Sequence, residues 1–393
     1  MSLPLEGIKV LDLSTMLPGP YCTMILADFG AEVIKVESPK GGDLFRGSKP
    51  LLGDTGGVFF QVNRNKKSVT LNLKSDAGRE IFYKLAADAD VIIEQYRPGV
   101  VKRLGVDYET ISRINPKVVY CSLSGYGQDG PYKTLSGHDL NYISYAGILG
   151  LTARQGQAPT IPGVQIADIG GGALYATIGI LLAVMGAQKS GVGQYVDTSM
   201  LDGAVSWLPI LASDYFVTGV APKAGSAMLI GRNACYEVYE TADGKYISIA
   251  AVEPHLWANF CDLIGREEFK AWQRDTERQP EMFEYLRALF KTKTRDEWCE
   301  TLRDCDCCWA PVLGVDEVFA DEQVLHRDML FEMEDPQGQY GKVKQIGSAV
   351  KLSRTPARRE LFPPRKGEHN AEYLGKIGYT DEEIAKFAED GII

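Results

Sequence analysis

One of the four histidines, His138, stands at a position suited to proton transfer. It follows Gly137 and a loop over residues 125–137 that is rich in glycine and proline, and a helix pattern begins beside it. A loop-to-helix junction can hold a side chain next to a cleft, and imidazole exchanges protons near neutral pH. The alternative is a surface histidine in the N-cap region of the helix. Position alone leaves both interpretations open.

Asp168 lies among small and apolar residues at the start of a long helix pattern, from about Gln165 to Gln188. A carboxylate there can cap backbone N–H groups and is stabilised by the helix dipole. Partial removal from water would also raise its pKa toward the range of a general base. Glycines follow at residues 170–172, which predicts close approach of a ligand or of another backbone. Asp168 is therefore either a helix cap or a general base.

Two basic segments predict a site for an anion. Arg64, Lys66 and Lys67 cluster before a predicted strand over residues 68–73, and Arg97 follows another strand at a turn that opens into a helix. In open α/β sheets, ligands bind at the carboxyl ends of strands, and anions favour helix N-termini. Ordinary surface charge is the alternative for either segment alone. No dinucleotide or P-loop glycine motif occurs in the context that those motifs require.

Glu253 and a cysteine cluster need a separate interpretation. Glu253 precedes Pro254, and proline suits the first helical position, so this carboxylate can simply begin a helix.

Cys305, Cys307 and Cys308 lack the paired spacing of a metal site, and their apolar neighbours favour a buried strand. We therefore expect no metal centre, and we interpret the eight cysteines as reduced thiols of a cytoplasmic protein.

The elements that position these residues alternate between strand and helix over the first 125 residues. Apolar runs over residues 8–13, 32–37, 68–73, 91–93 and 118–123 predict buried strands, with helix patterns between them. This alternation predicts an α/β fold with a mainly parallel sheet and right-handed crossovers.

Residues 225–320 show a different pattern. Strand-like runs at Tyr236–Glu240 and Tyr246–Ala250 flank an Asp-Gly turn, which predicts a hairpin. Helix patterns follow, so we expect a smaller α+β domain here. The predicted organisation is a large domain whose N-terminal part spans residues 1–215, the small domain over 225–320, and a return segment with a C-terminal helix over 325–393 that completes the large domain.

Composition limits the partners. The chain has 393 residues, of which 45% are hydrophobic and 24% charged, which is ordinary for a soluble globular protein. Its net charge of −10 gives no general attraction for nucleic acid or anionic lipid, so an anionic ligand would need a local basic pocket. The longest apolar stretches are shorter than a membrane span, and the start of the chain lacks the pattern of a signal peptide. We expect neither nucleic acid nor a membrane as a partner.

Segments along nearly the whole chain resemble CoA transferase family III, which is named after carnitine and bile-acid CoA transferases, and most of all its α-methylacyl-CoA racemases. These segments are VLDLSTMLPGPYCTMILADFGAEVIKVE (10–37), NRNKKSVTLNL (63–73), DVIIEQYRPGV (90–100), LSGYGQDGP (123–131), GHDLNYI (137–143), ADIGGG (167–172), GQYVDTSMLDG (193–203) and GEHNAEYL (367–374). The resemblance implies a Rossmann-like large domain whose parallel sheet is built from both chain ends, a smaller inserted domain, and a homodimer of interlocked subunits. It also implies an acyl-CoA thioester as substrate, with coenzyme A as part of that substrate and no prosthetic group.

The resemblance also implies site residues. In the transferases, an aspartate at the position of Asp168 is a nucleophile that forms anhydride and thioester intermediates. In the racemases it is the acid/base partner of a histidine, here His138, which a glutamate at the position of Glu253 supports. Ile169 departs from the racemase pattern, which usually has phenylalanine there. The implied CoA-binding residues are Arg97, Arg64, Lys66, Lys67, Tyr126, Gly127 and Lys40, the last standing where some relatives have an arginine.

The chemistry of a thioester fits a histidine and an aspartate that act together. A thioester acidifies its α C–H bond, and two bases on opposite faces of that carbon can remove and return the proton. The backbone N–H of Asp139 at a helix start is a candidate donor to the enolate oxygen. Together with this chemistry, the resemblance implies racemisation or epimerisation of 2-methylacyl-CoA thioesters by His138 and Asp168. The alternatives are CoA transfer between carboxylic acids with Asp168 as nucleophile, and CoA binding without catalysis.

Overall fold

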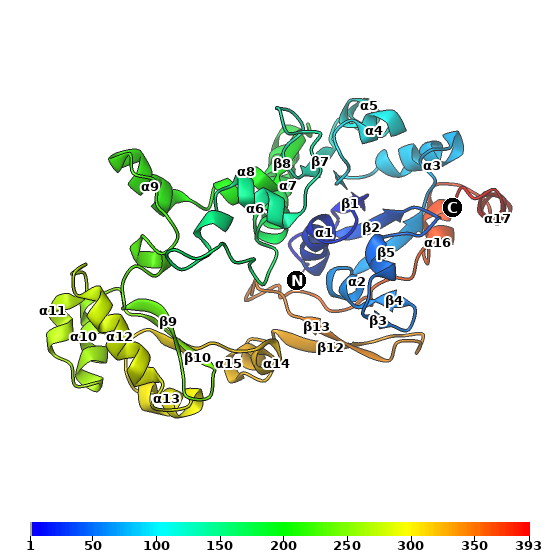
Figure 1. Ribbon diagram of the computed structural model, residues 1–393. Helices are drawn as coiled ribbons and strands as arrows, with labels where there is room; N and C mark the ends of the chain where they lie inside the picture. Colours follow the sequence, from blue (N-terminus) through cyan, green and yellow to red (C-terminus); the bar gives the residue numbers. More distant parts are fainter. Residues whose placement is uncertain (1) are drawn as a thin grey trace. The chain divides into compact units, whose positions relative to one another are not determined.

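The computed structural model describes residues 2–393 and divides into two compact units (Figure 1). The first unit comprises the chain up to Ala146 together with Gly163–Trp207 and Gln323–Ile393. The second comprises Gly147–Pro162 and Leu208–Glu322. The chain thus leaves the first unit twice and ends within it.

A parallel sheet of six strands forms the centre of the first unit, in the order β5-β2-β1-β6-β7-β8. The strands are β1 (Lys9–Asp12), β2 (Glu32–Glu37), β5 (Lys66–Thr70), β6 (Val91–Glu94), β7 (Val119–Ser124) and β8 (Tyr195–Ser199). Nearly every residue of the central strands is buried, as expected for a parallel sheet covered on both faces. The α/β fold with a parallel sheet that the apolar runs predicted is confirmed.

Helices cover this sheet, and several of them begin at capping residues. Ser75 accepts a hydrogen bond from the N–H of Gly78 at 3.0 Å and so starts α3 where the sequence predicted it. The remaining elements of this part are α1 (Pro18–Asp28), the short strands β3 (Leu51–Leu52) and β4 (Thr55–Gly56), α2 (Gly57–Val62), α3 (Asp76–Ala86), α4 (Val100–Leu104), α5 (Tyr108–Ile114), α6 (Asp139–Tyr145), a π-helical turn (Ile166–Leu174), α7 (Tyr175–Ser190) and α8 (Met200–Val205).

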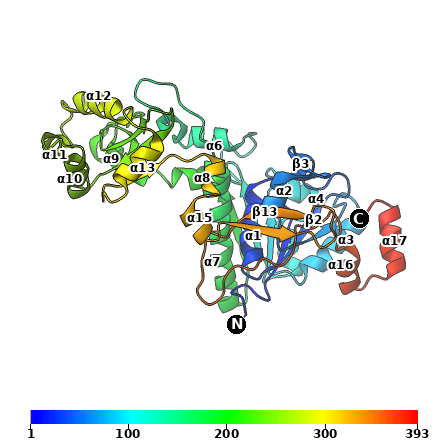
Figure 2. The same cartoon turned by 90° about the horizontal axis from the view of Figure 1, so that it is seen from below.

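The C-terminal segment adds no strand to the six-stranded sheet, so the prediction of a sheet built from both chain ends is wrong. It supplies the hairpin of β12 (Leu330–Glu334) and β13 (Lys342–Ile346), then α16 (Asn370–Lys376) and α17 (Asp381–Glu389). Apolar residues recur here at helical spacing, and α16 and α17 lie on the same side of this unit as α3 (Figures 1 and 2). In place of a strand, the segment around the start of α16 satisfies the edge of β5: the N–H of Thr70 donates to Asn370 Oδ1 at 2.8 Å, and the backbone N–H of His369 donates to the carbonyl oxygen of Ser68 at 2.9 Å.

The second unit is a small α+β structure around a sheet of three antiparallel strands. Tyr246 pairs with Glu240 across the predicted hairpin, which confirms that hairpin. Its elements are α9 (Pro209–Thr218), β9 (Tyr236–Glu240), β10 (Tyr246–Ala250), α10 (Pro254–Leu263), α11 (Glu268–Trp272), α12 (Gln279–Phe290), α13 (Arg295–Leu302), β11 (Trp309–Pro311) and α14 (Val315–Val318), and α15 (Glu322–His326) follows where the chain passes to the first unit. Helices α10 to α13 lie together (Figure 2), and Trp257, Phe260 and Phe290 form their buried core.

Within the described residues, one helical run is long and apolar enough to cross a membrane by length and composition. It is Ile166–Ser190, with a mean hydropathy of 1.8, and half of its most apolar window is buried inside the protein. The expectation that no apolar stretch is long enough was therefore wrong, because the π-helical turn and α7 continue as one helix. A core helix passes the same test, and this helix packs against β7, β8 and α1, so the run is weak evidence for a membrane span.

Candidate active site

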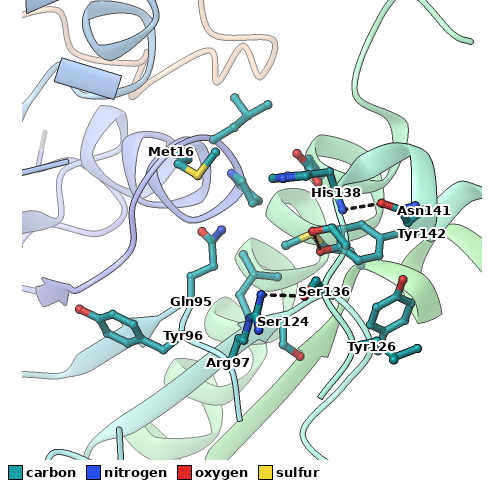
Figure 3. Close-up of a pocket in the computed structure, with 18 of the residues that line it drawn as sticks. Met16, Gln95, Tyr96, Arg97, Ser124, Tyr126, Ser136, His138, Asn141 and Tyr142 are labelled. Carbon is teal, nitrogen blue, oxygen red and sulfur yellow. Dashed lines mark hydrogen bonds between the residues drawn. The ribbon is translucent and has the colours of Figure 1, made fainter. Parts of the chain in front are cut away.

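A cavity of about 720 Å³ in the first unit brings four of the predicted site residues together (Figure 3). They are His138, Asp168, Arg97 and Tyr126. The cavity lies at the carboxyl ends of β6 and β7, because residues just beyond β6 and at the end of β7 line it. This is the edge at which parallel α/β sheets bind ligands.

His138 is the N-cap residue of α6 and also lines the cavity. Its backbone N–H donates to Asn141 Oδ1 at 3.1 Å, and its carbonyl oxygen accepts the N–H of Asn141 at 2.8 Å (Figure 3). These two bonds fix the backbone of His138 and leave its exposed imidazole at the cavity. The two interpretations of His138 are thus compatible, since a helix cap here places the ring beside a cleft.

The cap of the π-helical turn is the Asp139 carboxylate. Its Oδ1 accepts hydrogen bonds from the N–H of Ala167 at 2.6 Å and of Asp168 at 2.9 Å. Among the described residues, no hydrogen bond uses the carboxylate oxygens of Asp168 itself. The sequence left Asp168 open as a helix cap or a general base; the structure gives the cap to Asp139, which leaves the Asp168 carboxylate free to act on a ligand.

The electrostatic surroundings of Asp168 favour proton exchange. Burial, with the charge of Asp139 as a second cause, raises the pKa of Asp168 to about 6, and the nearby His138 opposes this rise. A carboxyl group with a pKa near 6 can both take and release a proton close to neutral pH. Asp168 therefore combines a free carboxylate with the acidity that general acid/base chemistry requires.

The glycines after Asp168 serve the packing of another backbone. A Cβ on Gly170 would lie 2.0 Å from the ring of Trp207, and one on Gly171 would lie 2.6 Å from the carbonyl oxygen of Met200 in α8. A Cβ on Gly203 of α8 would lie 2.0 Å from the carbonyl oxygen of Gly171. Of the two roles predicted for the glycines, the structure shows close packing of α8 against the turn that carries Asp168. A π-helical turn of this kind is frequent at functional sites.

Arg97 was predicted and lines this cavity, whereas sequence reasoning missed Asn141 and Tyr142. Arg97 is exposed, and its Nη2 donates to Ser136 Oγ at 2.8 Å (Figure 3). The hydroxyl of Tyr142 donates to the carbonyl oxygen of Gly137 at 2.6 Å, and its ring meets that of Tyr126 edge to face at 5.1 Å. Burial, helped by the Asp168 charge, raises the pKa of Tyr142 to about 12. The GHDLNYI spacing carried the signal for Asn141 and Tyr142, since helix positions three and four residues after His138 face the same side.

Two predicted CoA-binding residues require correction. Arg64 is buried, and its Nη2 lies 2.6 Å from Asp28 Oδ2. Lys66 is buried as well, with its Nζ 3.3 Å from Asp12 Oδ2 and 2.9 Å from the carbonyl oxygen of Pro20. Burial lowers the pKa of Lys66 to about 8. Because both cations are enclosed and paired inside the first unit, neither presents its charge to a phosphate group.

The remaining predicted residues do not line this cavity. Lys40 is exposed in the first unit, and Lys67 lies 3.7 Å from Glu372. Gly127 has a φ of +90°, and its N–H donates to Ser124 Oγ at 3.0 Å. Glu253 is exposed at the N-cap of α10 in the second unit, before Pro254. No group of three potential metal ligands occurs within residues 2–393.

Comparison with known proteins assigns the family. Residues 5–370 match CoA-transferase family III. The chain belongs to CoA-transferase family III. It is 34% identical to the succinyl-CoA:glutarate CoA-transferase of Homo sapiens, over 99% of this chain and 90% of that protein. It is also 34% identical to the alpha-methylacyl-CoA racemase of Mus musculus, over 99% of this chain and 97% of that protein.

A solved structure of a CaiB/BaiF family protein from Brucella suis supports the fold. It superposes with a TM-score of 0.83 at 32% identity, over 96% of this chain and all of that chain. The similarity to a racemase of the family equals the similarity to a transferase, so overall identity does not separate the two reactions.

Proposed function

We propose that this member of CoA-transferase family III acts on acyl-CoA thioesters and racemises or epimerises 2-methylacyl-CoA by removing and returning the α proton. The observation that carries the proposal is the presence of His138 and the unbonded Asp168 carboxylate in one cavity, with the pKa of Asp168 raised to about 6. With this pKa the Asp168 carboxyl group can take and release a proton near neutral pH, and imidazole is a general acid or base in many enzymes, so the pair suits a two-base exchange.

The proposed proton transfer uses one base on each face of the α carbon. In one direction the Asp168 carboxylate removes the proton, and the protonated imidazole of His138 returns a proton to the opposite face. In the other direction the neutral imidazole removes the proton and the Asp168 carboxylic acid returns one. The same number of protons is bound to the pair in both starting states, so no other group has to supply a proton.

The negative charge of the enolate needs a hydrogen-bond donor. Asp139 begins α6, and within the described chain no hydrogen bond uses its backbone N–H. A free N–H at this place can donate to the enolate oxygen, which is a strong contribution to catalysis in a site of low polarity. The Asp139 carboxylate meanwhile holds the turn of Asp168 in place.

The phosphates of coenzyme A are assigned to exposed cations. Of these cations, Arg97 has support from the structure, because it lines the cavity just beyond the end of β6. Lys40 and Lys67 remain predictions from the resemblance, as do Tyr126 and Gly127, and the same holds for Glu253 as a support for His138.

We also propose that the chain forms a homodimer. On α7, Ile178, Leu182 and Met185 follow one another at helical spacing and are 50%, 64% and 55% exposed. A stripe of large apolar side chains on a helix is typical of a surface that a second subunit covers. This surface supports an association between copies of the chain.

The second candidate function is CoA transfer between carboxylic acids. It is favoured by the identity to the human glutarate transferase, which equals the identity to the mouse racemase. In that reaction the Asp168 carboxylate would attack the thioester carbonyl, and the C–S bond would break to release the CoA thiolate and leave an anhydride on Asp168.

Solvent exchange distinguishes the two functions. The protein is incubated with each enantiomer of a 2-methylacyl-CoA in D₂O without any carboxylic acid acceptor. We expect deuterium at the α carbon and conversion of each enantiomer into the other. A parallel incubation contains a carboxylic acid; transfer of CoA to that acid, together with an α carbon that keeps its hydrogen in both incubations, would show the second function instead.

A further inference from the structure

The second unit has its own cavity, of about 800 Å³, which nothing in the proposed reaction uses. Its floor is one face of the β9–β10 hairpin, where Val238 pairs with Ser248 and Tyr236 pairs with Ala250. Cross-strand partners lie on the same face of a sheet. The opposite face carries buried Tyr239 and forms the core, so the floor is the face that this core leaves open.

The wall of this cavity is unusually basic for an acidic chain. Arg154, Arg232 and Arg287 line it, and Glu237 is the only carboxylate among the lining residues. The whole chain carries a net charge of −10, so this gathering of cations opposes the general charge of the molecule. Like charges in one cavity repel one another, and a bound anion removes that repulsion.

The three guanidinium groups differ in how far they are already paired. Arg154 lies 3.5 Å from Glu237, and the Nε of Arg232 donates to Asn233 Oδ1 at 3.0 Å. For Arg287, the described chain provides neither a hydrogen bond nor an ion pair, and its guanidinium lies over the ring of Phe283, 5.1 Å from the centre of that ring. Since one carboxylate faces three cations, the cavity keeps free donors for an oxyanion.

The loops that form the wall are held in place. Arg154 Nη2 donates to the carbonyl oxygen of Val238 at 3.1 Å, which ties its loop to the hairpin. Gly225 has a φ of +68°, and a Cβ there would lie 2.8 Å from the backbone nitrogen of Gln155, so the two loops pack backbone to backbone. A site whose loops are already ordered loses less entropy when it binds a ligand.

We propose that this cavity binds a small anionic ligand through a carboxylate or phosphate group, with Arg287 and Arg232 as the principal contacts and Arg154 as a positioning residue. Planar guanidinium groups suit both oxyanions, because two parallel N–H groups can meet two oxygens. The aromatic rings of Tyr236 and Phe283 face the same space and suit the apolar part of such a ligand. The proposal does not rest on proton exchange at Asp168.

Arginine modification tests the site in the full chain without measuring catalysis. Phenylglyoxal modifies free guanidinium groups, and mass spectrometry gives the rate at each arginine separately. Parallel reactions contain inorganic phosphate, glutarate or coenzyme A. Comparing these reactions shows whether the site binds a phosphate or a carboxylate group. We expect at least one of them, at ten times its half-saturating concentration, to slow modification of Arg287 and Arg232 about tenfold.

Arg303 is the matched control, because it is an exposed arginine of the same unit outside this cavity. Its rate should stay unchanged in every arm. Equal rates at Arg287 with and without all three anions would overturn the proposal. Equal protection of Arg303 and Arg287 would overturn it too, since that result reports only screening by ions.

Binding of the protecting anion to variants gives a second, independent measure. In an Arg97→Gln background, which removes the cation of the first cavity, Arg287→Gln should weaken binding about tenfold, while Arg303→Gln should not change it. Arg287→Lys should recover part of the lost affinity, because lysine keeps the positive charge but lacks the two parallel N–H donors of a guanidinium group. Unchanged affinity of the Arg287→Gln variant would overturn the assignment.

Discussion

Two groups of acidic and basic side chains in the first unit are made of similar residues but are built in opposite ways. Asp12, Lys35 and Lys66 lie on the neighbouring strands β1, β2 and β5 and are buried, and the Asp12 carboxylate accepts hydrogen bonds from Ser14, Thr23 and Lys66. Asp168 and His138 line a cavity, and the Asp168 carboxylate accepts no hydrogen bond from the described residues.

The difference shows in the acidity of the two aspartates. The pKa of Asp12 is lowered: burial alone would raise it, but Lys66, Lys35 and the hydroxyl groups together outweigh burial. The pKa of Asp168 is raised to about 6, because burial and Asp139 outweigh His138. A carboxylate whose partners are all supplied by the protein stabilises the fold, whereas one that lacks partners is available for a substrate.

The largest effect on activity should come from the pair at the cavity, Asp168 and His138. Replacing Asp168 by asparagine removes one base and keeps the shape, so we expect α-proton exchange to fall by about 10²- to 10⁴-fold. The midpoint of thermal unfolding should change little, because no hydrogen bond to this carboxylate is lost. Exchange within a few-fold of the parent rate would show that Asp168 does not act on the substrate.

The largest effect on stability should come from the buried cluster of Asp12, Lys35 and Lys66. Asp12→Asn leaves the buried ammonium group of Lys66 without its anion, while Lys35 keeps Asp43 Oδ2 at 2.8 Å, so we expect the free energy of unfolding to fall by about 3 to 5 kcal/mol. Denaturant unfolding measures this change. Asp88→Asn is the control, because Asp88 forms an exposed ion pair with Lys9 and its loss should cost below about 1 kcal/mol. Equal, small losses in both variants would contradict the comparison.

The two aspartates should also respond to pH with opposite signs. Because the pKa of Asp12 is lowered on folding, its contribution to stability is present above pH 3.8 and is lost as pH falls through its folded value. Because the pKa of Asp168 is raised from 3.8 to about 6, folding is favoured by the protonated form, and this contribution is lost as pH rises between those values.

Asp139→Asn sharpens the comparison by removing a charge and keeping an acceptor for the N–H groups of Ala167 and Asp168. The rate of α-proton exchange in the parent should fall as pH drops below about 6, since the Asp168 carboxylate is then protonated and can no longer accept the α proton. In the variant, the negative charge of Asp139 no longer raises the pKa of Asp168, so the fall in rate should begin at a lower pH. A pH–rate profile of each protein measures the shift, and coincident profiles would contradict the proposed influence of Asp139.

Two arginines separate binding from folding in the same way. Arg97→Gln should raise the KM for acyl-CoA about tenfold at low salt and leave stability unchanged, because Arg97 is exposed at the cavity. Arg64→Gln should instead destabilise the fold, because it leaves Asp28 buried without its cation. If Arg97→Gln binds acyl-CoA as the parent does at low salt, Arg97 carries only surface charge.

The sequence predicted the parts of this molecule that follow from local pattern. Apolar runs located the strands of the parallel sheet, and a loop-to-helix junction located His138. Burial of charge was not predictable in the same way. Arg64 and Lys66 belong to a basic segment whose composition is typical of an exposed surface. Only tertiary packing brings the carboxylates of Asp28 and Asp12 against these cations. Similarly, the capping of Asp168 by Asp139 joins residues 29 positions apart in the chain.

The most direct test of the account asks whether Asp168 ever forms a covalent bond. The protein is quenched during turnover with acyl-CoA, and the peptide that contains Asp168 is weighed by mass spectrometry, with hydroxylamine or borohydride used to trap any thioester. The proton-exchange account predicts an unmodified peptide while deuterium enters the α carbon. An acyl or CoA adduct on Asp168 would contradict it and establish this carboxylate as a nucleophile.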